Sequence, residues 1–416
     1  MIDISIIRRN PELVEKSSKS KNIKISVQSI VKTDAENRKY ITQIDKLRAE
    51  LRSLSKAKPD ADTIKKLRLL SDEIRNLENK QKIIDEKLKK LLYEIPAIPR
   101  PDVKIGKDEK DNETIKVVGN PRIFDNQMKD YMSLAEMHDL IDTKRAAKVS
   151  GTRFGYIKNE LALLEVALMQ YTLDLLAQKE RFVPFFPPVF VSETAMNAMG
   201  YIQHGGEDET YHFEKDKLYL VGTSEQSLGP YHMDEILDES KLPLRYCAFS
   251  TCFRREAGAA GKDTTGILRV HQFDKIEMFI FCKPEDSDKE HEYLLGLEER
   301  LVAGLELPYR IVKMCTGDLG MPASRKYDIE CWLPSQNTYR ETHSTSNCVD
   351  FQSRRLNIRY KNSLAKKNEF VHTLNGTAFA IGRILIMILE NYQNADGSIN
   401  VPKQLQSYMH GIKVIK

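Results

Sequence analysis

The fold is decided by Cys252-Phe253-Arg254-Arg255-Glu256-Ala257-Gly258 and, beyond the small-residue loop Gly261–Gly266, by Leu268-Arg269-Val270-His271-Gln272-Phe273-Asp274-Lys275-Ile276-Glu277-Met278-Phe279. Both segments have the composition of strands joined by a turn. Because side chains alternate between the two faces of a strand, we expect Arg254 and Glu256 on one face of the first strand. The same rule gives the second strand a face made of Arg269, His271, Phe273, Lys275 and Glu277.

This surface would carry guanidinium groups, an aromatic ring and carboxylates. Arginine binds phosphate, an aromatic ring stacks on a base, and a carboxylate accepts hydrogen bonds from an ammonium or an exocyclic amine. The pattern therefore indicates a nucleotide site. If the pattern covered fewer residues, a ladder of salt bridges on the surface of a hairpin would be the preferred interpretation.

Further strand-like runs lie on both sides of this hairpin, at Lys217–Val221, Leu244–Phe253, Ile267–Phe281, Tyr309–Met314 and Lys326–Trp332. They are joined by turns and not by regularly alternating helices, and Asn159–Arg181 has the pattern of an amphipathic helix. This order predicts an α+β fold in which helices flank an antiparallel sheet. The chain has neither a P-loop motif nor a Gly-x-Gly-x-x-Gly dinucleotide motif.

The first hundred residues have a different period. Apolar and small polar residues recur at alternating spacings of three and four, first at Ile30, Thr33, Asn37, Tyr40, Ile44, Leu47, Leu51 and Leu54 and then at Leu67, Leu70, Ile74, Leu77, Gln81, Ile84, Leu88 and Leu91. Each set predicts a helix with one narrow seam, as in a coiled coil. Turn-forming residues and Pro59 separate the two helices, which favours an antiparallel hairpin over an intermolecular dimerisation coil.

The charge is divided in the same way. The 416 residues carry a net charge of +4, but residues 1–100 hold 24 Lys and Arg against 15 Asp and Glu, which gives +9 there and −5 in the remainder. Such a basic appendage suits a large structured polyanion, although a solvated helical face is the simpler alternative. The candidate phosphate contacts on the hairpin are Lys46, Arg48, Arg52, Lys56, Lys58, Lys65, Lys66 and Arg68. We expect an appendage at 1–100, a linker at 101–125 and a catalytic body at 126–416.

Other features exclude several classes of protein. The longest apolar run, Phe379–Leu389, is interrupted by Arg383 and is too short to span a membrane, and the N-terminus lacks the pattern of a secretory signal. Six cysteines without paired C-x-x-C spacing argue against a disulfide framework or a zinc ribbon. We expect reduced thiols in a cytoplasmic protein that has no membrane contact.

The hairpin at Arg254 resembles motif 2 of the class II aminoacyl-tRNA synthetases, and nearly the whole chain resembles the seryl-tRNA synthetase family. The N-terminus and the basic hairpin match that family, Phe182–Pro188 is similar to motif 1, and Ala380-Ile381-Gly382-Arg383 is similar to motif 3. Further matches are Ala147–Phe154, Thr316–Gly320, Trp332–Asn337 and Thr373–Thr377. The resemblance implies activation of L-serine with ATP, with Mg²⁺ as cofactor, followed by transfer to tRNA(Ser) and, where it exists, tRNA(Sec). It also implies a homodimer and an arm that binds tRNA.

Carried over residue by residue, the resemblance makes Arg254 and Arg383 the catalytic residues. It implies ATP contacts at Arg254, Arg255, Glu256, Arg269, Val270, Phe273, Glu341, Thr342, His343, Ser344 and Arg383. Glu341 and Ser344 would also hold Mg²⁺, a cation that prefers oxygen ligands. The serine contacts would be Thr223, Ser224, Glu225, Arg254, Glu277 and Thr377, and the division of ammonium and hydroxyl between the two glutamates stays open. For tRNA the contacts would be Lys46, Arg48, Arg52, Lys56, Lys65 and Arg68.

The sequence departs from the family pattern in three places. Ser224 replaces the commoner Ala, and Arg181 stands before Phe182 where Gly is usual. Thr342 and His343 stand between Glu341 and Ser344 where small or aliphatic residues are commoner, and His343 is either an inert neighbour of the site or a modifier of the magnesium shell. Two other functions remain alternatives: an amino acid:carrier-protein ligase, whose family uses zinc and lacks the arm, and a non-catalytic RNA-binding paralogue.

Overall fold

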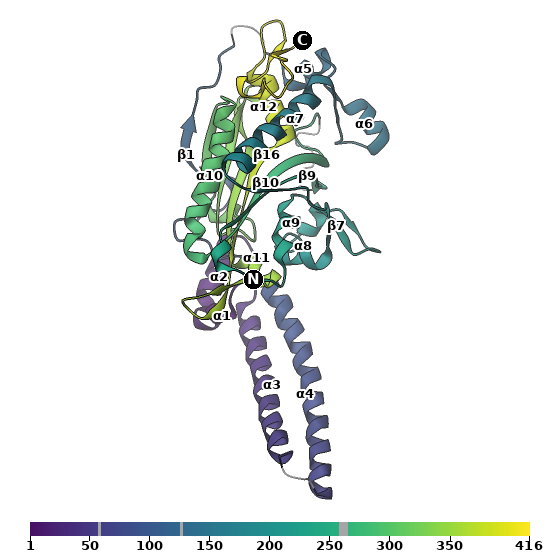
Figure 1. The fold of residues 1–416 in the computed structure, drawn as a ribbon, viewed down its shortest axis with the longest axis vertical. Helices are drawn as coiled ribbons and strands as arrows, with labels where there is room; N and C mark the ends of the chain where they lie inside the picture. Colours follow the sequence, from purple (N-terminus) through teal and green to yellow (C-terminus); the bar gives the residue numbers. More distant parts are fainter. Residues whose placement is uncertain (57–59, 125–127, 258–264) are drawn as a thin grey trace. The chain divides into compact units, whose positions relative to one another are not determined.

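The computed structural model describes residues 1–56, 60–124, 128–257 and 265–416, which form two compact units, Met1–Ile98 and Pro99–Lys416 (Figure 1). Lys58 and Pro59 of the predicted hairpin turn, the boundary predicted at residues 125 and 126, and most of the small-residue loop that follows Ala257 lie outside the described residues. No described helix has the length and apolar character that crossing a membrane requires.

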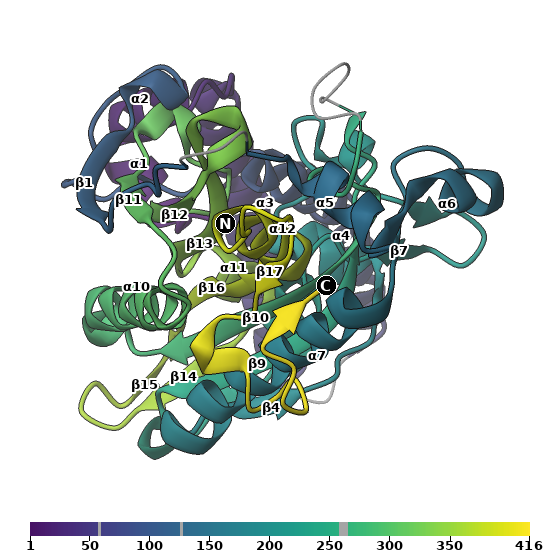
Figure 2. The ribbon, with the colours of Figure 1, turned by 90° about the horizontal axis from the view of Figure 1, so that it is seen from above.

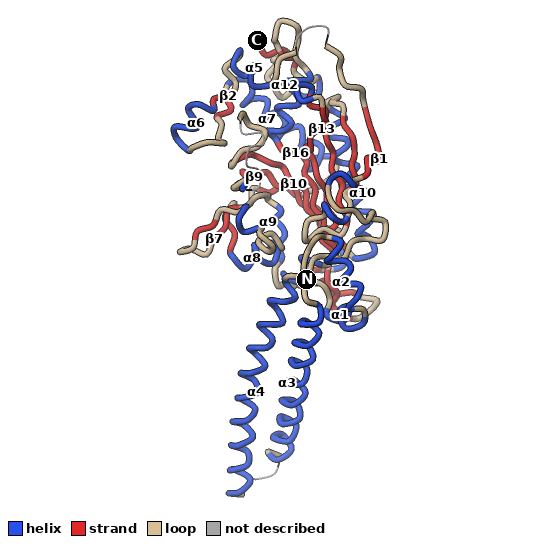
Figure 3. Tube along the Cα trace, turned by 180° about the vertical axis from the view of Figure 1, so that it is seen from behind, coloured by secondary structure: helices blue, strands red, loops and turns tan. Residues whose placement is uncertain are grey.

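The first unit is helical and contains the predicted hairpin. Its elements are α1 (Ile4–Arg9), α2 (Pro11–Ser20), α3 (Val27–Leu54) and α4 (Ala61–Tyr93). The long helices α3 and α4 run side by side in opposite directions, which confirms the antiparallel arm (Figure 3). The start of α4 is fixed by Asp60, whose carboxylate accepts a hydrogen bond from the Thr63 backbone N–H at 2.8 Å.

The seam between α3 and α4 follows the predicted 3-4 spacing. Ile30, Ile44, Leu70, Ile74 and Leu88 are buried along it. A polar cluster interrupts the seam: the Asn37 amide donates to Asp85 at 3.1 Å and accepts from Gln81 at 3.0 Å. Polar groups that must meet across a seam select one register of the two helices.

The second unit is built on an eight-stranded sheet in the order β1-β11-β12-β13-β16-β10-β9-β4, antiparallel except where β4 joins β9. The strands are β1 (Glu113–Val118), β4 (Val183–Phe185), β9 (Leu244–Phe253), β10 (Gln272–Cys282), β11 (Tyr309–Lys313), β12 (Arg325–Leu333), β13 (Thr338–Val349) and β16 (His372–Ala380). The large helices are α7 (Asn159–Leu173), α10 (Ser287–Gly304) and α12 (Ile381–Asn391). This architecture confirms the predicted α+β fold (Figure 2).

Smaller elements surround this sheet. The short helices are α5 (Tyr131–Met137), α6 (Thr143–Ser150), α8 (Glu193–Met199), α9 (Glu225–Leu228) and α11 (Phe351–Leu356). The short strands are β2 (Ile141–Asp142), β3 (Tyr156–Ile157), β5 (Phe190–Ser192), β6 (His212–Phe213), β7 (Leu218–Leu220), β8 (Ile236–Leu237), β14 (Arg359–Asn362), β15 (Lys367–Phe370), β17 (Ile399–Asn400) and β18 (Val414–Ile415).

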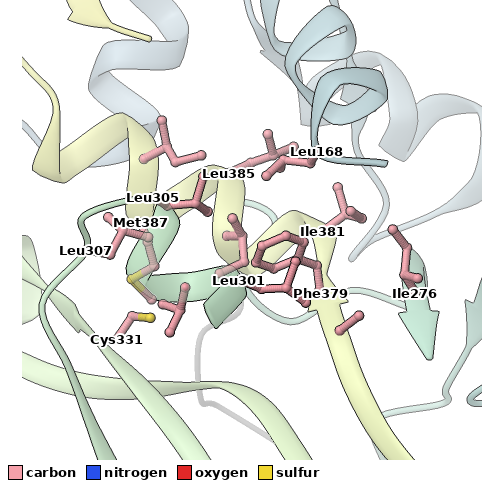
Figure 4. Packing of buried hydrophobic residues seen from close by; sticks show 14 of the residues in the cluster. Leu168, Ile276, Leu301, Leu305, Leu307, Cys331, Phe379, Ile381, Leu385 and Met387 are labelled. Carbon is pink, nitrogen blue, oxygen red and sulfur yellow. The ribbon is translucent and has the colours of Figure 1, made fainter. Parts of the chain in front are cut away.

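The alternation along β10 separates the main core from the functional face. Ile276, Met278 and Ile280 point into the core that α7, α10 and α12 cover, where Figure 4 shows Ile276 with Phe379, Leu301 and Leu385. Phe279 and Phe281 point the other way, into a second apolar cluster. The residues Phe273, Lys275 and Glu277 therefore share the face that leads into this second cluster, as predicted.

Two predicted boundaries were wrong, and a strand lies within the predicted linker. The strand expected at Ile267–Phe281 begins only at Gln272, so Arg269 and His271 precede it. The helix expected at Asn159–Arg181 is α-helical to Leu173 and continues as a π-helical segment, Asp174–Lys179. Part of the predicted linker is β1, an edge strand whose side chains are mostly exposed, so its sequence lacks the apolar alternation of a half-buried strand. The strands β13 and β16 were not among the predicted strands.

Candidate active site

The functional face carries a pocket whose walls come from the sheet, from the turn between two of its strands and from the start of a helix. Its basic end is defined by Arg254, Glu256, Arg269, Glu341 and Arg383. The acidic end is the group Thr223, Glu225, Lys275, Glu277 and Thr377: Lys275 and Thr377 line this pocket, Thr223 lines an adjoining one, and the two glutamates are buried behind the lining. The turn between β9 and β10 supplies the first three residues, the middle of β13 supplies Glu341, and the start of α12 supplies Arg383. Arg254 lines both the main pocket and the adjoining one that contains Thr223. The structure therefore places Thr223 and Thr377 beside the predicted nucleotide residues, while Glu277 and Glu225 lie behind the lining, hydrogen-bonded to Thr223 and Tyr201 of the adjoining pocket.

Arg254 lies just beyond the end of β9 and is fixed on both sides. Its Nε donates to the Gly222 carbonyl at 3.1 Å, and its guanidinium carbon lies 5.4 Å from the centre of the Phe273 ring. Its backbone N–H donates to the carbonyl of His271 at 3.0 Å. These contacts hold a permanent positive charge at the junction of the two pockets.

Glu256 reaches the same pocket by a route that strand alternation did not predict. The strands end before it, and its φ of +50° is in the left-handed region, so the simple two-residue rule does not place its side chain. Its carboxylate pairs with Arg269 at 2.9 Å across the hairpin. The predicted neighbourhood of Arg254, Glu256 and Arg269 is confirmed, but turn geometry produces it.

The carboxylate of Glu341 lies beside Arg383 at the basic end. The Arg383 guanidinium is 3.3 Å from this carboxylate and donates to the Glu341 carbonyl at 2.9 Å. Enclosure in the pocket raises the pKa of Glu341, but Arg383, Lys326 and Arg254 outweigh that effect and lower the pKa to about 2. Because 45% of its side chain remains exposed, Glu341 is an ionised oxygen donor that a ligand can reach.

Thr342, His343 and Ser344 follow Glu341 on β13 but differ in where their side chains lie. Thr342 lines the pocket and donates to the Ile329 carbonyl at 3.2 Å. His343 is 0% exposed and packs against Phe379 in the core, where burial lowers its pKa to about 3. The structure therefore does not bring the His343 ring into the pocket, and that ring is neutral.

Two charged residues of this region were missed. Lys326 and Asp328 line a groove that Glu341, Arg269 and Arg383 also line, and Ser344 hydrogen-bonds to Asp328. Burial raises the pKa of Asp328 to about 7, although the ammonium of Lys326, 3.2 Å away, lowers it. Alternation along the predicted strand Lys326–Trp332 places both residues on one face, and this signal was sufficient to find them.

The acidic end contains two buried carboxylates. Glu277, on β10, is 1% exposed, accepts from the Thr223 hydroxyl at 3.0 Å and forms an ion pair with Lys275. Glu225, the first residue of α9, is 3% exposed. Burial and the charge of Glu277 raise the pKa of Glu225 to about 7.

The remaining predicted contact residues differ in whether their side chains line the pocket. Thr377 lies near the acidic end, 3.4 Å from the Lys275 ammonium, and Val270 lines the pocket. Ser224 is 0% exposed, and its hydroxyl has no hydrogen-bond partner among the described residues. The Arg255 side chain is exposed and does not line the described pockets.

The six residues predicted to bind tRNA all lie exposed on α3, α4 or the turn after α3. Arg48 pairs with Glu78 across the hairpin at 2.7 Å. Among the described residues, His, Cys, Asp and Glu side chains form no group of three or more that could hold a metal ion. The six cysteines are buried free thiols.

Both units match models of known protein families. The model of the seryl-tRNA synthetase N-terminal domain matches residues 1–99, and the model of the class II tRNA synthetase core domain (G, H, P, S and T) matches residues 210–392. The serine–tRNA ligase of Dictyoglomus turgidum is 44% identical and that of Nitrosopumilus maritimus 38% identical, each over 100% of this chain and at least 99% of the relative.

Solved structures are similar over the same length. The seryl-tRNA synthetase from Pyrococcus horikoshii complexed with ATP superposes with a TM-score of 0.92 at 39% identity, covering 100% of this chain and 99% of that one. The cytoplasmic serine–tRNA ligase from Naegleria fowleri in complex with AMP gives 0.89 at 34% identity with the same coverage. Neither a carrier-protein ligase nor a non-catalytic paralogue finds support in these matches.

Proposed function

Because the chain belongs to the seryl-tRNA synthetase family, we propose that it acts as a serine–tRNA ligase whose two half-reactions take place in the pocket around Arg254. In the first, an oxygen of the serine carboxylate attacks the α-phosphorus of ATP, and the bond to pyrophosphate breaks. In the second, a ribose hydroxyl of the terminal tRNA adenosine attacks the seryl carbonyl carbon, and AMP leaves. The observation that carries the proposal is the pair of adjoining pockets, both lined by Arg254, with a basic end in one and buried carboxylates behind the lining of the other.

At the basic end, Arg254 neutralises the charge that grows on the α-phosphate during attack. Its position between the two pockets puts the guanidinium where nucleotide and amino acid must meet. Arg383 and Arg269 hold the outer phosphates, Phe273 stacks on the adenine, and Glu256 accepts from the adenine amine. No protein nucleophile is required, because orientation and charge stabilisation account for the rate.

The same end suits Mg²⁺ bound with ATP. Glu341 and Ser344 would hold the ion, since both supply oxygen donors and Glu341 is ionised throughout the physiological pH range. The ion would supply additional neutralisation of the phosphate charge. The ring of His343 contributes no ligand, because it is buried in the core.

At the acidic end, Thr223, Glu225, Glu277 and Thr377 bind serine. Two carboxylates suit one ammonium and one hydroxyl. A site whose buried polar groups require a hydroxyl partner rejects the analogue that lacks it by about 10⁴–10⁵, so alanine is excluded without an editing domain. Ser224 is a further proposed serine contact, and its hydroxyl is buried with no hydrogen-bond partner among the described residues.

The measurement that tests this function is ATP–pyrophosphate exchange across the twenty amino acids. We expect exchange that depends on serine and on magnesium. Faster exchange with threonine, glycine or alanine would show that the acidic end has been assigned to the wrong substrate.

We further propose that the arm binds tRNA(Ser), and tRNA(Sec) where that tRNA exists, through the exposed residues Lys46, Arg48, Arg52, Lys56, Lys65 and Arg68. Joining Ser29 to Leu92 by a short flexible linker should spare serine-dependent exchange and cripple transfer to tRNA. The charge reversals Lys56→Glu and Lys65→Glu should weaken tRNA binding and reduce its salt dependence, because each lost phosphate contact lowers the slope by about 0.7–0.9. Equal transfer rates with and without the arm would contradict this role.

A homodimer is the expected assembly. Motif 1 contains β4, the edge strand of the sheet, in which Val183 is 51% exposed, and Phe186 directly after it is 75% exposed. Apolar side chains exposed at a sheet edge favour burial against a second copy. Sedimentation of wild type and of Phe186→Glu should distinguish a dimer from a weakened or monomeric form.

A further inference from the structure

The Glu225 carboxylate is enclosed by two donors that lie outside the predicted serine contacts. The Tyr201 hydroxyl donates to one carboxylate oxygen at 2.6 Å, and the Gln352 amide nitrogen donates to the other at 2.8 Å. Tyr201 follows α8 and Gln352 lies in α11. Segments that are far apart in the sequence thus meet on one carboxylate.

The orientation of the Gln352 amide is set by a third residue. The Thr373 hydroxyl donates to the amide oxygen of Gln352 at 2.7 Å, and both residues are 0% exposed. If the amide were flipped, its oxygen would face the Glu225 carboxylate and two acceptors would meet without a proton between them. Thr373 therefore directs the NH₂ group of Gln352 at Glu225.

Tyr201 is likewise fixed as the donor in its hydrogen bond to Glu225. Burial, and then the negative charge of Glu225, raise the pKa of Tyr201 well above its usual value, so the hydroxyl keeps its proton and donates. The two donors oppose the unfavourable burial of the Glu225 charge beside Glu277. Lys275 is the cation of this cluster, but its ion pair is with Glu277.

We propose that Tyr201 and Gln352 are positioning residues that fix the Glu225 carboxylate for the amino-acid substrate. This inference rests on the proposed serine-binding role of Glu225. Each donor occupies one oxygen from the protein side, so the remaining lone pairs of Glu225 are directed by the cage and not by free rotation of the side chain. The cage thus determines how well the acidic end binds serine. Gln352 acts from behind the described pockets, whereas Tyr201 lines the adjoining pocket beside Thr223 and Arg254.

The test is the Michaelis constant for each substrate in ATP–pyrophosphate exchange. Tyr201→Phe and Gln352→Met should each raise the serine KM about 10- to 100-fold, the range expected when a hydrogen bond to a charged group is lost. The ATP KM should change less than about twofold, because the basic end is untouched. Gln352→Glu should raise the serine KM further, since it places a second carboxylate against Glu225.

Tyr246→Phe is the matched control. Tyr246 is 6% exposed and its hydroxyl bonds to His232 at 2.7 Å, outside the pocket. This variant loses a buried hydroxyl in the same way and should keep both KM values. If it shifted the serine KM as much as Tyr201→Phe does, a general structural effect would replace the positioning role.

A double-mutant cycle separates positioning from stability. In the Glu225→Gln background, Tyr201→Phe should add little to the serine KM, because the charged acceptor is already gone. Additive effects, or a serine KM within twofold of wild type in the single variants, would overturn the inference. Absence of serine-dependent exchange in the wild type would instead overturn the proposed function.

Discussion

At the basic end of the pocket the pKa of Glu341 is lowered to about 2, whereas at the acidic end that of Glu225 is raised to about 7. Burial raises the pKa of both carboxyls. Three cations, Arg383, Lys326 and Arg254, reverse this effect at Glu341. Glu225 instead faces the carboxylate of Glu277, which the charge of Lys275 offsets only in part, and within the described part of the chain its carboxylate accepts from two neutral donors. One region of the molecule thus holds a permanently charged carboxylate on β13, suited to the cations of a nucleotide complex, and a carboxyl on α9 whose charge depends on its immediate contacts.

The largest expected effect comes from removing the cation between the two ends. Arg254→Ala should lower the rate of serine activation about 10²- to 10³-fold, because a donor to charge that develops in the transition state contributes about 2.7–4 kcal/mol. Single-turnover formation of seryl-adenylate measures it. Far-ultraviolet circular dichroism should match wild type, and activity within tenfold of wild type would remove Arg254 from this role.

A matched pair of neutralising substitutions should separate the two ends. Glu277→Gln should raise the serine KM about 10- to 100-fold with little change for ATP, because an ammonium or hydroxyl loses a charged partner. Glu341→Gln should instead raise the magnesium concentration needed for half-maximal exchange and leave the serine KM nearly unchanged. If either variant changed both the serine KM and the dependence on ATP and magnesium, the division into a basic and an acidic end would be contradicted.

The smallest effect concerns pH. Glu225 is mostly protonated at pH 6 and mostly ionised at pH 8, because its folded pKa is about 7. Serine keeps the same charge over this interval, so its affinity should rise about tenfold from pH 6 to pH 8 as the carboxylate forms. Calorimetric titration of the protein with serine alone measures this change, and a dissociation constant independent of pH would show that Glu225 does not bind serine in its ionised form.

The spacing of apolar residues along the sequence was sufficient to predict much of the fold. The 3-4 spacing from Ile30 to Leu54 identified the arm because a helix repeats its buried face at that interval. The strand Leu244–Phe253 was predicted with its observed bounds. Where the pattern is weak, as in the exposed edge strand β1, the sequence did not reveal an element, since its residues have no buried face to mark them.

The sequence by itself determined the arm, the sheet face with Phe273, Lys275 and Glu277, and the family from its motifs. Only the tertiary structure decided that Glu256 reaches the pocket through a left-handed turn, that His343 faces the core, and that Tyr201 and Gln352 enclose Glu225. The physical reason is that a sequence pattern reports on one element at a time. Periodicity reports which face of one element is buried. These arrangements instead depend on turn geometry and on contacts between different elements, up to the 127 positions that separate Glu225 from Gln352, and such contacts exist only once the sheet has assembled.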